Sequence, residues 1–207
     1  QNTTGAENTA VGFLALISNT TASFNTALGH GAMQSNTTGS HNTAVGLDSL
    51  YNNTTGTRNV AVGLNASVNS TTAADNTVVG YAAFGANTTG AGNTAIGKSA
   101  SAANTTGANN AAIGHEAGIA VTTGSNNLLL GTSAGGSSSP SGNITTESNR
   151  VCIGNNSITN SYIKVDWTVT SDARDKMNFA EVPHGLSFVN DLQPVKFDFK
   201  KSRDNAT

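Results

Sequence analysis

A 17-residue repeat fills the first two-thirds of the chain and constrains its fold more than any other feature of the sequence. Each repeat has a core of the form Asn-Thr-Ala-Val-Gly, and every core starts one period after the last, with no slip. A fixed short period of this kind is typical of a stack of similar coils. Seventeen residues are too few for two helices but accommodate two short strands and two turns, and the β-branched core residues favour a strand.

The predicted fold class is all-β: a parallel β-solenoid of 17-residue coils over residues 1–136. Coils stacked about 4.8 Å apart would rise roughly 40 Å over eight repeats. Within each core, alternation places Thr9 and Val11 on one face of the strand and Ala10 on the other. Both faces carry apolar columns, and a strand that is apolar on both faces is expected to be buried on both.

The thinness of such a coil predicts self-association. One strand face can fill the coil interior, and the other needs a cover. The simplest cover is another copy of the chain, so we expect side-by-side packing through the small column of Ala10 and its equivalents. Closed cyclic symmetry is the usual arrangement for such contacts, which predicts a homo-oligomer.

The asparagine that opens each core predicts a structural ladder, because stacked Asn side chains can hydrogen-bond to the coils above and below. This role is favoured over ligand binding for the whole column. Its members are Asn8, Asn25, Asn42, Asn59, Asn76, Asn93, Asn110 and Asn127.

Composition and spacing argue against chemistry in the repeats. The net charge of −2 gives no basic surface for nucleic acid, and no apolar run approaches the ~20 residues of a membrane span. Cys152 is the sole cysteine, and His30 and His115 share a column but lie roughly 24 Å apart at the usual strand spacing. We therefore expect no metal site, no cofactor, no nucleic-acid partner and no membrane insertion.

The repeat register breaks after Gly131. Gly135–Gly142 is rich in turn residues, and a degenerate core returns at Arg150–Gly154, which we interpret as a capping coil. Tyr162–Thr170 alternates in polarity and predicts a connecting strand, with Trp167 as a packing anchor. The second predicted domain therefore covers residues 137–170: the insertion, the capping coil and this strand.

A third domain is predicted over residues 171–207, where the share of charged residues rises sharply. Gly185–Leu192 has a helical apolar spacing that ends before Pro194, and Val195–Lys200 alternates again as a strand. Because Gln1 is not a start methionine and the repeat is already in phase at Asn2, we interpret the chain as part of a longer protein.

The repeat block, over about residues 2–136, resembles the head repeats of trimeric bacterial adhesins, and similar repeats occur in phage tail fibres. The resemblance is carried by the recurring Asn-x-Ala-aliphatic-Gly cores. It implies a β-roll assembled as a parallel homotrimer and implies little about a ligand.

Residues 171–200 resemble the start of the intramolecular chaperone domain of phage tail spikes and fibres, the S74 peptidase family. The matching features are Ser171-Asp-Ala-Arg-Asp-Lys176 and the segment from Leu186 to Phe197. The resemblance implies a domain that holds three chains together during folding and then cuts itself off. It assigns the nucleophile to Ser171, its partner to Lys176 and the scissile bond to Thr170–Ser171. A serine hydroxyl needs a base, and a lysine can serve when burial keeps it neutral.

The function predicted from these features is structural: a trimeric fibre or spike segment of a phage tail, extracellular and part of the virion. Its expected partners are two further copies, other tail proteins and, as receptor, a bacterial surface glycan or protein. Enzymatic activity is expected only as single-turnover self-cleavage. The alternative is the head of a bacterial trimeric autotransporter adhesin, which would require a membrane anchor downstream. An ice-binding solenoid is disfavoured because adjacent Thr3 and Thr4 cannot share one face.

Overall fold

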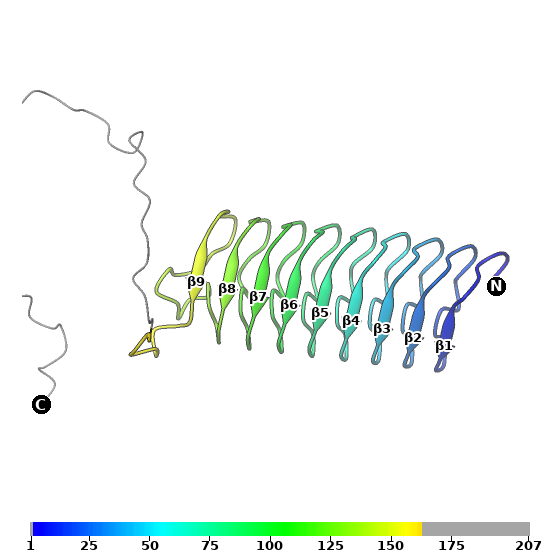
Figure 1. The fold of residues 1–207 in the computed structure, drawn as a ribbon, viewed down its shortest axis with the longest axis horizontal. Coiled ribbons are helices and arrows are strands. Elements are labelled where there is room, and N and C mark those ends of the chain that lie inside the picture. The colour runs from blue at the N-terminus through cyan, green and yellow to red at the C-terminus, as the bar shows by residue number, and fades with distance from the viewer. Residues whose placement is uncertain (1, 163–207) are drawn as a thin grey trace, which may run out of the picture. The chain divides into compact units, whose positions relative to one another are not determined.

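The chain forms a parallel β-solenoid, as predicted, in a computed structural model that describes residues 2–162. The described residues contain nine short strands and no helix, and consecutive strands lie side by side in one sheet of order β1 to β9 (Figure 1). The strands are β1 (Thr9–Val11), β2 (Thr26–Leu28), β3 (Thr43–Val45), β4 (Val60–Val62), β5 (Thr77–Val79), β6 (Thr94–Ile96), β7 (Ala111–Ile113), β8 (Leu128–Leu130) and β9 (Val151–Ile153).

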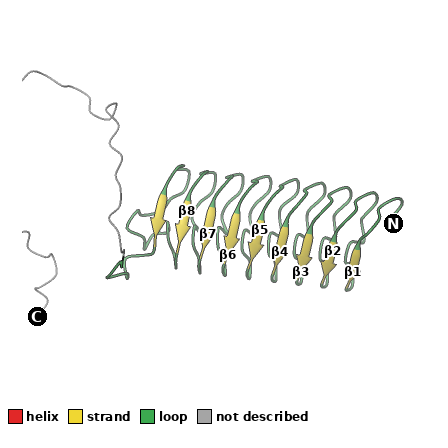
Figure 2. Ribbon diagram, viewed as in Figure 1, coloured by secondary structure: helices red, strands yellow, loops and turns green. Residues whose placement is uncertain are grey.

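The register follows the repeat without deviation. Thr9 pairs with Thr26 and Val11 with Leu28, and the same positions pair at every later step. Even β9, which follows β8 after a longer connection, keeps the register by pairing Leu129 with Cys152. Turns and loops make up the rest of each coil (Figure 2).

Each strand ends after three residues because a glycine follows it in a conformation that other residues rarely adopt. From Gly12 to Gly114, the glycines of this column have φ between 130° and 140°. A Cβ atom at Gly80 would meet the backbone carbonyl of Gly97 in the next coil. Glycine therefore satisfies two needs here, a backbone conformation disfavoured for L-residues and close contact between stacked coils.

The coil interior is filled by two apolar columns. The middle residue of each strand from β2 to β9 is buried, as at Ala44, Ala61 and Val78. A second column comes from the turn after each strand and contains Leu16, Met33, Leu50 and Phe84. These four residues are spaced at multiples of 17, which is why they fall in one column.

One expectation about the faces of the strand is wrong. We expected the Ala10 column to face outward and to contact other copies of the chain. Its members Ala27, Ala44 and Ala95 are instead fully buried inside the coil of a single chain. A 17-residue coil leaves so little room behind the strand that mainly small side chains fit there, and the larger aliphatic residues point outward.

The last described coil is enlarged by the insertion after Gly131. The backbone N–H of Ile144 donates to the carbonyl of Gly135, 2.9 Å away, which closes the inserted loop onto the coil. Ser139 and Ile144 from this loop are buried, and Ile144 belongs to a small apolar cluster with Leu129 and Cys152. The insertion therefore fills the interior beside β8 and β9.

Candidate functional site

The residues assigned to self-cleavage, Ser171 and Lys176, and the bond Thr170–Ser171 lie outside the described residues, as does Trp167. Their roles remain predictions. The features described below come from residues 2–162 and concern assembly and surface recognition.

The asparagine column that opens the cores lies inside the solenoid, where each side chain links successive coils. Asn42 is typical: its Oδ1 accepts from the backbone N–H of Asn59 at 2.9 Å, and its Nδ2 donates to the carbonyl of Gly56 at 2.8 Å. Some neighbours also pair amide to amide, as Asn59 Nδ2 does with Asn42 Oδ1 at 3.1 Å. The main partners are thus backbone groups of the next coil, because a buried backbone donor or acceptor must find a partner.

A second buried amide column was missed by the sequence reasoning. It consists of the asparagines that open the Asn-Thr-Thr-Gly segments, such as Asn36 and Asn53. Asn53 Nδ2 donates to Asn36 Oδ1 at 2.8 Å, and Asn36 Nδ2 donates to the carbonyl of Gly39 at 2.9 Å. The recurrence of Asn at this position could have revealed the column. Asn is also common in turns, however, and the recurrence was attributed to a turn alone.

Threonines beside this column add a further link between coils. The hydroxyl of Thr37 donates to the carbonyl of Thr54 at 3.0 Å, and Thr20, Thr54 and Thr88 repeat this contact one coil apart. Side chains therefore tie the coils together on the side of the turn as well as along the sheet.

The solvent-facing side of the sheet carries a continuous aliphatic column. Val11 is 55% exposed, Leu28 47% and Ile113 41%, although each is the apolar residue of its core. We call the aliphatic column the set Val11, Leu28, Val45, Val62, Val79, Ile96, Ile113, Leu130 and Ile153.

Two columns beside the aliphatic column form, together with it, what we call the outer face. One contains Thr9 and its equivalents, and the other contains Glu7 and its equivalents. In the second of these, Phe24 and His41 stack with ring centroids 4.9 Å apart. Arg58 and Asp75 form a two-pronged ion pair through Nε–Oδ1 at 2.6 Å and Nη2–Oδ2 at 2.9 Å. The hydrogen bond and the charge of Arg58 hold the pKa of Asp75 below its usual value.

A bordering column follows the turn glycines and starts at Phe13. Its ring lies 5.4 Å from that of His30, and His30 Nδ1 is 3.8 Å from Asp48 Oδ1. Tyr81, further along the same column, is 53% exposed. Rings therefore gather along this border of the aliphatic column.

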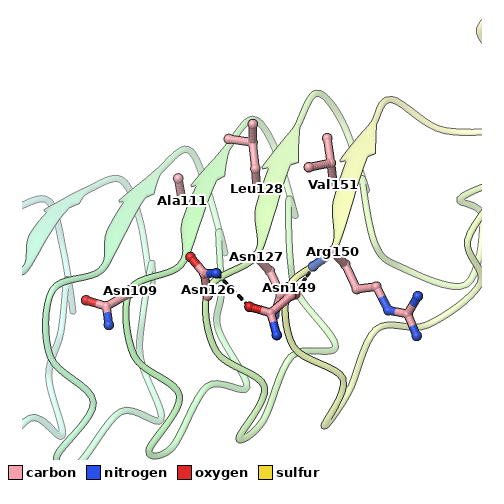
Figure 3. A pocket seen from close by; sticks show the side chains of 8 residues that line it. All are labelled: Asn109, Ala111, Asn126, Asn127, Leu128, Asn149, Arg150 and Val151. Carbon is pink, nitrogen blue, oxygen red and sulfur yellow. Dashed lines mark hydrogen bonds between the residues drawn. The ribbon is translucent and has the colours of Figure 1, made fainter. Parts of the chain in front are cut away.

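A shallow pocket of about 370 Å³ lies on the outer face near its C-terminal end (Figure 3). Amide side chains of Asn109, Asn126 and Asn149 form one wall, and Leu128 and Val151 form another. Asn126 Nδ2 donates to Asn149 Oδ1 at 2.6 Å, so some of the hydrogen-bonding groups in the polar wall are already paired with each other. The pocket contains no acid–base pair and is a surface groove between coils.

Cys152 caps the buried column at β9. Burial raises the pKa of its thiol, but hydrogen bonding to Ser139 and Ser141 outweighs this effect and leaves the pKa below its usual value. The Sγ–Oγ distance to Ser139 is 2.7 Å. Because the thiol is buried and engaged by the inserted loop, the geometry fits a packing role.

Among residues 2–162, no group of three or more His, Cys, Asp or Glu side chains is arranged to hold a metal ion. Within the same part of the chain, no helix is long and apolar enough to cross a membrane.

Residues 171–207 match the family described as the chaperone of endosialidase, peptidase S74. No curated protein and no solved structure matches the chain. The matched family implies trimer assembly, and the match together with the parallel β-solenoid fits a phage tail fibre with a C-terminal chaperone.

Proposed function

We propose that this chain is a structural segment of a phage tail fibre or spike, in which three copies form a rigid solenoid shaft that leads into a folding chaperone. The observation that carries the proposal is the conjunction of an uninterrupted parallel sheet with the chaperone match at residues 171–207. The alternative, the head of a bacterial adhesin, shares the solenoid but not this match.

The contacts between coils support a mechanical role as a stiff shaft. Every coil is joined to the next by strand pairing, by Asn side chains that bind backbone groups, and by Thr hydroxyls. Such links run along the long axis of the stack, so the shaft resists bending and local opening. As a tail component it would act outside the cell beside other tail proteins, with a bacterial surface glycan or protein as its receptor.

The chaperone segment would release itself by a single peptide cleavage. In the proposed step, Lys176 in its neutral form takes the proton of the Ser171 hydroxyl, and the oxygen attacks the carbonyl of Thr170. The Thr170–Ser171 amide bond breaks as an ester forms to the Ser171 oxygen, and the Ser171 nitrogen leaves as an amine. Water then hydrolyses the ester, so the products end in a Thr170 carboxylate and begin with a free Ser171 amine.

The intact mass of the full-length gene product under denaturing conditions tests this step. Wild type should give two species that meet at Thr170–Ser171, whereas Ser171→Ala and Lys176→Met should give only the uncut mass. Ser157→Ala, an exposed serine of the described part, should cut like wild type. An uncut wild-type chain, or cleavage that survives Ser171→Ala, would overturn self-release and leave the structural role standing.

A further inference from the structure

Exposed apolar side chains are concentrated on one side of the solenoid. Among the described residues, all the large hydrophobic side chains that are exposed lie on the outer face or in the bordering column, except Ile17, Ile158 and Tyr162. Scattered apolar residues are normal on a monomer, but a continuous patch marks an interaction site.

Two of the three columns of the outer face also lack the charges that would keep them in water. Neither the aliphatic column nor the column of Thr9 contains an Asp, Glu, Lys or Arg in any described coil. Parallel sheets are usually buried on both faces, and here only the inner face is covered within one chain. These two columns therefore have the composition of an interface core, and the charged residues of the outer face are confined to its third column.

The size of the outer face fits assembly. At about 3.3 Å per residue and about 4.8 Å per strand, it measures roughly 16 Å by 40 Å, a flat footprint of roughly 600 Å². Stable interfaces bury about 800 Å² on each partner. The side chains stand out from the sheet, so the area they bury exceeds the flat footprint and reaches this class.

We propose that the outer face is where three copies of this chain pack around a common axis parallel to the solenoid, with the aliphatic column innermost. This inference rests on the proposed function for the number of copies, three. What it adds is the surface through which the copies contact one another. It also replaces the Ala10 column, which is buried within one chain, as the contact between copies.

A copy of the same chain fits this face better than an unrelated partner because the pattern repeats every coil. With the axis along the stack, each coil meets its own equivalents at the same height, so all nine aliphatic positions are matched at once. Three-fold packing brings the column of Glu7 beside the bordering column of a neighbour. No described coil carries Asp, Glu, Lys or Arg in both columns, so this contact creates no like-charge pair within a coil level.

A pair of charged substitutions tests the assignment in the 207-residue chain. Val79→Glu with Ile113→Glu puts carboxylates at the proposed axis, two coils apart. Thr72→Glu with Thr106→Glu is the matched control, because both threonines are exposed in the same two coils but outside the outer face and the bordering column. In a Ser171→Ala background, which keeps the chain uncut, light scattering coupled to size-exclusion chromatography should give three times the 20.8 kDa chain mass for the parent chain and for the control. For the Val79/Ile113 variant the mass should fall threefold.

Cysteine cross-linking gives a second readout, which does not require the folded chain to accommodate a new charge. The native thiol, Cys152, is buried, so an introduced cysteine is the accessible one. Val79→Cys should form a disulfide between two of the three chains under mild oxidation, since its Cα atoms would meet near the axis. Thr72→Cys should not. Non-reducing electrophoresis under denaturing conditions distinguishes them.

The outcomes separate this inference from the proposed function. A monomeric wild-type chain would overturn both the trimeric shaft and the interface. A trimeric wild type whose Val79→Cys variant cross-links no better than Thr72→Cys would overturn the interface alone. If the Val79/Ile113 variant stays trimeric but loses binding to bacterial surface glycan, the face is a receptor surface and the inference fails.

Discussion

Buried amides are the residue-scale feature that makes this chain stack. Asn42 reaches a backbone donor at Asn59 and a backbone acceptor at Gly56, both in the next coil, so one side chain satisfies two main-chain groups. An alanine would leave the buried Asn59 N–H without a partner, whereas the Gly56 carbonyl would still accept from Asn53 Nδ2 at 3.1 Å. A glutamine is one methylene too long for the same geometry. The repeat of Asn follows from this requirement in every coil.

Asn42→Ala should therefore lower the free energy of unfolding by about 1–3 kcal/mol, because it leaves the buried Asn59 N–H without a partner and such a group costs about that much. Asn104→Ala is the matched control. Asn104 is fully buried, but within the described residues its side-chain amide has no hydrogen-bond partner, since Val121 replaces Asn in the next coil. Asn104→Ala should therefore change the free energy of unfolding by less than about 1 kcal/mol. Chemical denaturation followed by circular dichroism compares the two, and equal losses would contradict this account.

The Arg58–Asp75 pair should add a small pH dependence. The pKa of Asp75 is lowered by Arg58, so the ionised form is favoured in the folded state. The stabilisation is present above the ordinary carboxylate range and is lost as the pH falls through the lowered pKa. Because the side chains of Arg58 and Asp75 are 60% and 50% exposed, the effect should be slight and should weaken in salt. Melting temperatures from pH 7 to pH 2 for wild type and Asp75→Asn check it: the difference between them should shrink at low pH and not grow.

At the scale of the element, the short strand and its terminal glycine act as one unit. The glycine turns the chain out of the strand at φ near 135°. Because it has no side chain, the backbone carbonyl of the equivalent glycine in the next coil can also approach closely. A side chain at this position would add backbone strain and push coils apart at once. Such strain costs of order 1–3 kcal/mol before any clash is counted.

Gly80→Ala should thus destabilise the protein by more than about 2 kcal/mol, because it adds the clash with Gly97 to the strain at φ 140°. Gly85→Ala in the same coil is the control, since Gly85 has no positive φ and the nearest atom to an added Cβ, the Ala82 oxygen, lies 3.3 Å away. Thermal melting by circular dichroism distinguishes them. A Gly85→Ala variant as unstable as Gly80→Ala would show that the turn tolerates no side chain anywhere.

On the scale of the whole molecule, each coil contacts its nearest neighbours, so the stack should tolerate changes that preserve the period. Removing residues 36–52 deletes one full period and joins Ser35 to Asn53, which keeps every column aligned. We expect this variant to fold, with a cooperative melt at a somewhat lower temperature. Removing residues 36–51 leaves one extra residue in the joined coil, which has to bulge out of the turn between Ser35 and Asn53.

The 16-residue deletion should therefore melt at a lower temperature than the 17-residue deletion, although it removes less of the chain, because the extra residue interrupts the contacts between coils at the junction. The comparison uses two variants that differ by one residue, so composition and length cannot explain a difference. If both variants melt alike, an extra residue in one coil costs nothing, and the exact coil length is not what stabilises the shaft.

The sequence alone determined the class and the axis of this fold. A period of 17 with Asn and Gly at constant positions permits only coils that place like residues over like, which is why the strand, the register and the core role of Met33 and Phe84 were predictable. The match of residues 171–207 was likewise foreshadowed by the spacing from Ser171 to Lys176 and by the segment that follows. Repetition makes these inferences strong, because each is tested again in every coil.

Only the tertiary structure decided which strand face lies inside. Alternation separates Ala44 from Val45 but does not say which of them the turns enclose, and both columns are apolar. The answer depends on the volume left once the coil closes, which is small enough to favour alanine and to send the aliphatic column outward. The buried partners of Asn36 and Asn42 are also tertiary facts, since they are backbone groups and no side-chain pattern records them.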